Sequence, residues 1–349
     1  MSAETAKRNI CDVAELAGVS RMTVSRVINN AANVKPDTVM RVRNAMKACG
    51  YKPGPVKNRK GRSSGRQRPA SYRKMQVALL SGFESFLLNT PVYGKVMHGI
   101  EQALAQLDYS MIVRKLSNHA PWSCIPPKID GAILFQVPTD NPRLLRELRR
   151  IPCVRVMGAT RKDDFFDHVT YNNSQVGQLA AEYLLSKQHT RAAIFWSGNP
   201  EAQYELERHD AFKEALNAGN GSIVDCAGVF IDESSHKSQL PDVRKLMHAV
   251  EKELKSDNPP TAIFATADIV AAGLYHVLPH LNMTPGRDIE IIGCNADELY
   301  INPFGAEKPA SIDIHPEQVG KRAIEQLFWR MANPKEPLNS IKLDVEVVT

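Results

Sequence analysis

Residues 12–29 read DVAELAGVSRMTVSRVIN, and this stretch decides how the N-terminal part of the chain folds. Gly18 can take the left-handed conformation that ends a helix, and Ser20 then stands where the N-cap of a following helix is expected. The pattern therefore predicts two short helices joined by a tight turn. The apolar face of the first helix is expected to hold Val13, Leu16 and Ala17.

The second helix should turn a polar and basic face to solvent. Val24, Val27 and Ile28 repeat at i, i+3 and i+4 and should face the first helix. A short helix with a basic outer face is typical of the recognition helix of a helix-turn-helix, which reads DNA in the major groove. A three-helix bundle without a DNA role is the alternative. The outward side chains are expected to be Arg21, Met22, Ser25, Arg26 and Asn29.

Charge and apolar content bound the class of protein. The 349 residues carry a net charge of +6, but residues 1–74 hold 17 Lys and Arg against 4 Asp and Glu, so the remainder is acidic. This division predicts a basic part that meets a polyanion and a body that does not. We expect a cytoplasmic protein, because no apolar run is long enough for a membrane span and no apolar leader is seen. The six cysteines lack metal-site spacing and should be small buried thiols.

We expect three parts: an all-α helix-turn-helix domain (1–51), a basic linker (52–74) and an α/β body (75–349). The linker is rich in Lys, Arg, Gly, Ser and Pro and cannot bury enough apolar surface to fold alone. It either lies against DNA phosphates or is a solvated spacer. From residue 75 onward, apolar strands alternate with amphipathic helices, which predicts parallel sheets covered on both faces. The length of this part suggests two lobes.

The N-terminal stretch resembles the signature of the lactose-repressor (LacI/GalR) family of bacterial transcription regulators, DVAxxAGVSxxTVSRVxN. The body is similar to this family at VxxNNxxxG (169–177), Arg208-xxx-Phe212, Thr266-Ala267-Asp268 and Ile292-Gly293-Cys294-Asn295. The resemblance implies a periplasmic-binding-protein-like core of two lobes with a small effector between them, and a homodimer on a near-palindromic operator. It further implies a transcriptional regulator, expected to be a repressor, controlled by a sugar or related metabolite.

The resemblance also assigns roles to residues of the N-terminal domain. Arg21, Met22 and Arg26 match positions that read base edges, where arginine can pair with guanine. Ser20 and Thr23 could serve only for helix capping, and Arg26 only for an intrahelical ion pair. Positions matching backbone contacts or caps are Asn9, Ser20, Thr23, Ser25, Asn29, Thr38 and Tyr51.

The linker departs from the family pattern. Relatives carry a hinge helix whose leucine enters the minor groove, but Lys57 and Lys60 stand at the alanine and leucine positions, and Pro55 would interrupt a helix. We expect Lys57 and Lys60 to belong instead to a basic arm that follows the DNA backbone or an A·T-rich minor groove.

The effector site is expected around Arg208, whose planar guanidinium suits a carboxylate, phosphate or sugar hydroxyl. The other candidates are Phe83, Phe135, Asn172, Asp268 and Asn295. Asn172 and Asn295 replace carboxylates of sugar-binding relatives, which favours an uncharged or anionic effector.

Each of these candidates has a structural alternative. Arg208 could form a surface pair with Glu205 or Glu207, Asp268 could cap a helix, and the two phenylalanines could be core. We expect no cofactor and no metal, although His276 and His280 lie four residues apart. No nucleotide-binding, metalloprotease or nucleophile motif occurs, so we do not expect an enzyme. A small-molecule sensor without operator specificity, a sugar-handling α/β enzyme and a regulator without an effector are the other readings.

Overall fold

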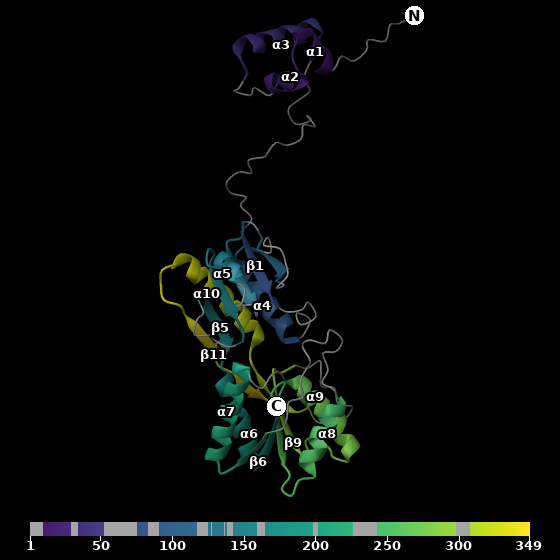
Figure 1. Ribbon diagram of the computed structural model, residues 1–349, viewed down its shortest axis with the longest axis vertical. Coiled ribbons are helices and arrows are strands. Elements are labelled where there is room, and N and C mark those ends of the chain that lie inside the picture. The colour runs from purple at the N-terminus through teal and green to yellow at the C-terminus, as the bar shows by residue number, and fades with distance from the viewer. Residues whose placement is uncertain are drawn as a thin grey trace, which may run out of the picture. The chain divides into compact units, whose positions relative to one another are not determined.

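The computed structural model divides the chain into two compact units, Met1–Tyr72 and Arg73–Thr349, called here the head and the body (Figure 1). The structure describes residues 10–28, 34–51, 75–82, 91–116, 125–126, 128–135, 137, 142–158, 165–197, 202–225, 243–297 and 308–349.

The described residues of the head form α1 (Ile10–Ala17), α2 (Arg21–Ile28) and α3 (Pro36–Ala48). The predicted turn between the first two helices is confirmed. Gly18 has a φ of 63°, and the Ser20 side-chain oxygen accepts a hydrogen bond of 3.2 Å from the Thr23 amide. Such a cap satisfies one of the free N–H groups at the start of a helix.

The prediction of the apolar face of α1 is wrong at one residue. Leu16 is 59% exposed, and Ala14 is buried in its place beside Val13 and Ala17. Val24, Val27 and Val42 are buried with them, as a helix pair closed by a third helix requires. The face of α1 therefore follows the spacing 13, 14, 17, which is as compatible with helical periodicity as the expected one.

Within the described residues, the body contains two sheets. The strands of the first are β1 (Gln76–Ser81), β2 (Ser110–Lys115), β3 (Gly131–Phe135), β4 (Cys153–Val156), β5 (Asp167–Tyr171) and β11 (Ser340–Leu343). Their order is β11-β5-β4-β3-β1-β2, with parallel pairing throughout. The central strands β1 and β3 are mainly apolar and buried except for Gln76, as expected of a parallel sheet covered on both faces.

The second sheet has the order β12-β10-β9-β8-β6-β7. Only the pair formed by the C-terminal strand is antiparallel among its described pairs. The strands are β6 (Arg191–Phe195), β7 (Ser222–Asp225), β8 (Ala262–Ala265), β9 (Glu290–Cys294), β10 (Ala310–Asp313) and β12 (Glu346–Val348). Each sheet is the centre of one lobe, which agrees with the two-lobed expectation.

Helices cover both sheets. Those of the first lobe include α4 (Pro91–Gln106), α5 (Pro142–Leu148) and α10 (Pro316–Ala332). In the second lobe, α6 (Asn173–Ser186) and α7 (Gln203–Ala218) lie on one side of the sheet, and α8 (Val243–Leu254) and α9 (Asp268–Val277) on the other (Figure 1). A 3-10 turn, Leu278–Leu281, follows α9. No helix among the described residues is long and apolar enough to cross a bilayer.

Among the elements that the structure describes, the chain crosses between the lobes at three places. It leaves the first sheet after β5 to enter α6, returns after β10 to enter α10, and crosses again between β11 and β12. Each lobe is therefore assembled from segments that are distant in sequence.

Glycine lets one pair of helices approach closely in each lobe. A Cβ at Gly320 of α10 would collide with the Val96 carbonyl of α4, and one at Gly177 of α6 would collide with the Arg208 carbonyl of α7. The glycine that ends the VxxNNxxxG motif therefore has a packing role.

The sequence predicts strands near residues 76–80, 110–113, 129–135, 152–157, 192–195, 261–264 and 289–292, and the structure has a strand close to each. It also predicts helices near residues 93–104, 175–187, 205–217, 240–255, 268–278 and 316–331, and each of these occurs. The sequence reading missed α5, β7, β10, β11 and β12, and it treated β5 only as part of a motif. These elements are short, and β11 and β12 are half-exposed, so no continuous apolar run marks them. The three prolines of residues 117–128 predict an irregular loop in place of a helix, and this segment lies mostly outside the described residues.

Candidate functional sites

The outer face of α2 is the first candidate surface. Arg21, Met22 and Arg26 are exposed, and the Met22 side chain is 65% accessible. Arg21 contacts the neighbouring helix through Nη1, which lies 3.4 Å from the Cys11 sulfur. Cys11 is exposed, contrary to the expectation of a buried thiol. The helix-turn-helix thus turns two arginines and a methionine outward from a packed apolar base.

The polar residues around α2 have mixed environments. The Ser20 hydroxyl caps α2 and lies 3.0 Å from the Thr23 hydroxyl, so the capping role of this pair is present. Ser25, Thr38 and Tyr51 are half-buried. Tyr51 lines a hollow of about 440 Å³ with Arg43, Met46, Lys47 and Gly50 at the end of α3. Asn9, Asn29, Lys57 and Lys60 lie outside the described residues.

Arg208 is the centre of a buried polar cluster in the body. It lies on α7 with 3% of its surface exposed, and all three guanidinium nitrogens donate hydrogen bonds. Nε donates to Asn173 Oδ1 (2.9 Å), Nη1 to the Thr266 carbonyl (2.5 Å) and Nη2 to the Tyr171 hydroxyl (2.6 Å). Burial disfavours its charge, but its neighbours, Tyr171 foremost, raise the pKa of Arg208 above the usual value. The arginine therefore stays charged inside the protein.

The surface ion pair considered for Arg208 does not occur. Glu207 pairs with Lys342 at 3.4 Å, and Glu205 is fully buried. The Glu205 Oε1 atom accepts hydrogen bonds from Ser197 Oγ (2.7 Å) and Thr266 Oγ1 (3.4 Å). Its Oε2 atom is buried and has no hydrogen-bond partner in the part of the chain that the structure describes.

Asp268 holds a neighbouring loop in place. Its Oδ2 atom accepts from the Asp297 amide (2.7 Å), and Ser311 Oγ donates to its Oδ1 atom (2.7 Å). The capping role considered for Asp268 is not seen, because the N-cap of α9 is Ala267. Burial raises the pKa of Asp268 to about 7.

An ion pair joins the lobes beside this loop. Lys95 of α4 lies 3.5 Å from Asp297 Oδ1 and donates to the Ala296 carbonyl at 3.2 Å. Burial raises the pKa of Asp297 to about 6, and Lys95 opposes that rise. The contact connects the first lobe to the segment that follows β9.

The remaining predicted effector residues have structural contacts of their own. The Asn172 side chain caps α6 by accepting a hydrogen bond of 3.3 Å from the Gln175 amide. Phe135 is fully buried, with its ring 5.8 Å from that of Tyr93. Asn295 is half-buried with a φ of 110°. Phe83 lies outside the described residues.

The structure gathers Arg208 and Asp268 near the carboxyl ends of strands of the second lobe. Several members of the cluster are not predicted from the sequence: Tyr171, Asn173, Ser197, Thr266, Asp297 and Ser311. Most of them lie in or just after a strand end. Their common signal in the sequence is a polar residue close after an apolar run, which marks the carboxyl end of a strand.

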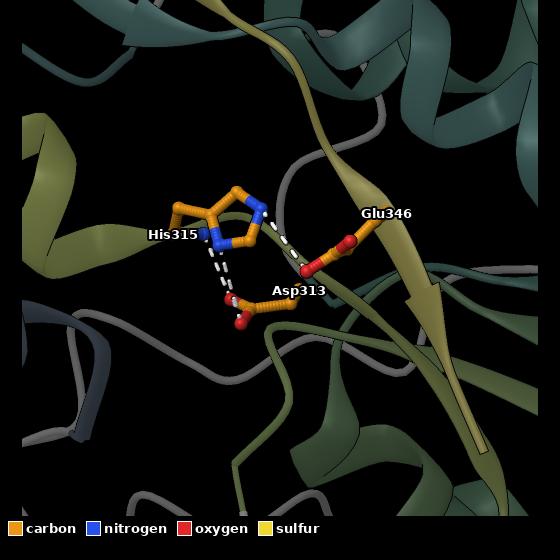
Figure 2. Close-up of side chains that lie close together, drawn as sticks. All are labelled: Asp313, His315 and Glu346. Atoms are coloured by element: carbon orange, nitrogen blue, oxygen red, sulfur yellow. Dashed lines mark hydrogen bonds and ion pairs between the residues drawn. The ribbon is translucent and has the colours of Figure 1, made fainter.

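A third cluster lies where the chain crosses between the lobes (Figure 2). His315 Nδ1 lies 3.3 Å from Asp313 Oδ2, and its Nε2 lies 3.6 Å from Glu346 Oε1. The two ring nitrogens face different carboxylates, whereas a chelated cation would need one nitrogen and both carboxylates on one side. We therefore interpret the cluster as a structural contact that joins the β10–α10 connection to β12. His276 and His280 stack edge-on with ring centroids 5.7 Å apart.

Two family models match the chain. Residues 9–54 match "Bacterial regulatory proteins, lacI family", and residues 181–349 match a periplasmic-binding-protein-like domain. The HTH-type transcriptional repressor PurR of Mannheimia succiniciproducens is 26% identical over 349 residues, which cover 97% of this chain and 96% of the relative.

Solved structures share the fold. A transcriptional regulator CelR–cellobiose complex matches with a TM-score of 0.61 at 22% identity, covering 98% of both chains. The lac repressor dimer bound to operator and the anti-inducer ONPF matches with a TM-score of 0.62 at 18% identity, again covering 98% of both chains. The matched families and relatives are DNA-binding regulators and not enzymes.

Proposed function

Because the chain belongs to the lacI family of bacterial regulatory proteins, we propose that it binds a near-palindromic operator as a homodimer under the control of a small effector. The chain is a DNA-binding transcriptional regulator. The proposal adds that the DNA site is symmetric, that two copies of the chain bind it, and that a small ligand controls this binding.

The observation that carries the proposal is the outer face of α2. Arg21, Met22 and Arg26 project from a helix whose other face is fixed by Val24 and Val27. In a helix-turn-helix such residues meet base edges in the major groove, with arginine bidentate to guanine and methionine against a thymine methyl. A dimer would place two such helices in half-sites one helical turn, or a multiple of it, apart.

We assign the parts as residues 1–51 for DNA binding, 52–74 for a basic arm and 75–349 for effector binding and dimerisation. We propose that a sugar or related metabolite binds near Arg208 and Asp268 and favours one arrangement of the lobes. A ligand shifts such an equilibrium only by its difference in affinity for the two states, typically about 1–3 kcal/mol. The relatives named PurR are repressors, so we propose repression, and we place the protein in the cytoplasm with its DNA target.

Binding-site selection from random duplex DNA tests this proposal with the full-length protein. We expect enrichment of one sequence with two symmetric halves. The double variant R21A/R26A should lose the enrichment. The double variant R150A/R322A removes two exposed charges from the body and should keep it. Failure of the wild-type protein to enrich any sequence contradicts operator binding.

A further inference from the structure

Two buried carboxylate oxygens of the effector site have no hydrogen-bond partner among the described residues, Glu205 Oε2 and Asp297 Oδ1. Asp297 Oδ1 lies 3.5 Å from the Lys95 amine, whereas nothing described satisfies Glu205 Oε2. We propose that the effector presents a hydrogen-bond donor, a hydroxyl or amino group, to Glu205, and is not an anion held by Arg208. The inference rests on the proposed function, since it names the chemical class of the ligand in that same site. It also narrows the expectation from the sequence, which favours an uncharged or an anionic effector, by excluding the anion.

Arg208 is poorly placed to hold an anion, because its hydrogen-bonding capacity is used inside the protein. Each of its nitrogens donates to a different group, namely the Asn173 amide oxygen, the Thr266 carbonyl and the Tyr171 hydroxyl. The Tyr171 and Tyr204 rings lie 5.5 and 5.8 Å from the guanidinium carbon. A carboxylate or phosphate would have to displace these partners, so we assign Arg208 to building the site.

Glu205, unlike Arg208, has hydrogen-bonding capacity that the protein does not use. Its carboxylate is fully buried, Oε1 accepts two hydrogen bonds, and Oε2 is without a hydrogen-bond partner in the described chain. A buried acceptor left unpaired is costly, and one that persists in a folded protein points to a missing partner. That partner must donate a hydrogen.

The position of Glu205 favours a ligand as this donor. Its two partners, Ser197 and Thr266, directly follow or closely follow the carboxyl ends of β6 and β8. In parallel α/β sheets, ligands bind outside the carboxyl ends of the strands. Glu205 therefore lies where the fold binds ligands, with an acceptor still available.

A ligand-free experiment tests the acceptor itself. Glu205→Gln keeps the shape and the Oε1 acceptor and replaces only the oxygen that has no hydrogen-bond partner, so the full-length variant should unfold at the same or a higher temperature than wild type. Asp167→Asn, made at a buried carboxylate that accepts four hydrogen bonds, should unfold at a lower temperature. A fall in Tm for E205Q as large as that for D167N would overturn the proposal, because Glu205 would then be a satisfied structural group.

A ligand panel tests the class. Ribose and cellobiose supply hydroxyls, adenine and putrescine supply amino groups, and inorganic phosphate and citrate supply anions. We expect a compound from the first two groups to raise the Tm of wild type and to bind E205Q about tenfold more weakly or worse, with Glu207→Gln unchanged. A panel in which only anions bind, in which no compound binds, or in which E205Q binds as wild type does, overturns the proposal. Operator selection is read independently, so failure of DNA binding is distinguished from failure of this ligand assignment.

Discussion

The two lobes each bury an arginine and a carboxylate, but they use them differently. In the first lobe, the Asp167 side chain accepts from Arg330 Nε (2.8 Å) and Nη2 (2.7 Å), from Gln326 Nε2 (2.9 Å) and from the Asn339 amide (2.8 Å). In the second lobe, Arg208 is satisfied while Glu205 keeps one oxygen unpaired.

This difference separates a structural group from a candidate binding group. The Asp167–Arg330 pair joins β5 to α10 and the segment after it, and hydrogen bonding to Arg330 and Gln326 outweighs burial to lower the pKa of Asp167. Glu205 is equally buried, but one of its carboxylate oxygens has no hydrogen-bond partner among the described residues. A buried charge is therefore evidence of a ligand only where its hydrogen bonds are incomplete.

Breaking the pair of the first lobe should have the largest effect. Asp167→Ala leaves the Arg330 charge buried without its partner and should lower the free energy of unfolding by about 3–5 kcal/mol. Denaturant unfolding of the full-length chain measures this. Arg322→Ala removes an exposed partner of Glu325 and should cost about 0–1 kcal/mol. Equal losses in the two variants would contradict the structural role of Asp167.

The glycine contacts sharpen the comparison. Gly177→Ala pushes α6 away from the Arg208 carbonyl, and Gly320→Ala pushes α10 away from Val96, so each should cost about 1–3 kcal/mol of stability. Only G177A moves the backbone that carries Arg208, so only G177A should also weaken effector binding, measured by titration calorimetry. If G320A weakens effector binding as much as G177A does, the loss does not depend on moving the Arg208 backbone, and the predicted difference between the lobes is wrong.

A third arginine, Arg21, is exposed and should act on DNA alone. Arg21→Ala should lose about 1–3 kcal/mol of binding free energy at one base position in each half-site while leaving unfolding unchanged. Fluorescence anisotropy with single-base operator variants measures this. A loss of equal size on every sequence would make Arg21 a phosphate contact.

The pH dependence of stability should show the smallest effect. Burial raises the pKa of Asp268 to about 7, above the value of about 3.9 for exposed aspartate. Between these values the folded state holds a proton that the unfolded chain releases, so this group loses its favourable contribution as the pH rises through 7. Asp297, with a pKa of about 6, acts in the same direction.

Wild-type protein should therefore lose on the order of 1 kcal/mol more stability than Asp268→Asn between about pH 5 and pH 8. Denaturant unfolding at the two pH values gives the difference. An equal loss in the two proteins would show that Asp268 is already ionised at pH 5 and would contradict the raised pKa.

What the sequence predicted well depends on neighbours in the chain. Gly18 and Ser20 act within one turn, and apolar runs such as β1 and β3 carry their own signal, so the head and the alternation of the body were predictable. Leu16 was misplaced because two faces of α1 satisfy the helical spacing almost equally.

The partners of the buried polar groups were not predictable in this way. Asp268 bonds Ser311, 43 residues away, and Glu205 bonds Thr266, 61 residues away. Both contacts follow from which strands are neighbours in the sheet, and local spacing does not contain that order. Motif similarity points to Arg208 and Asp268, whereas the sequence suggests Glu205 only as a surface partner of Arg208.

The three crossings between the lobes determine which parts of this protein recombination can exchange as a unit. The head is one continuous N-terminal segment, so a recombination event at a single point could exchange it for another head. The lobes are interlaced, and excising either would require several cuts and new joins. During evolution, DNA preference can therefore change by exchange of the whole head. Ligand preference must change by amino-acid substitutions within the body.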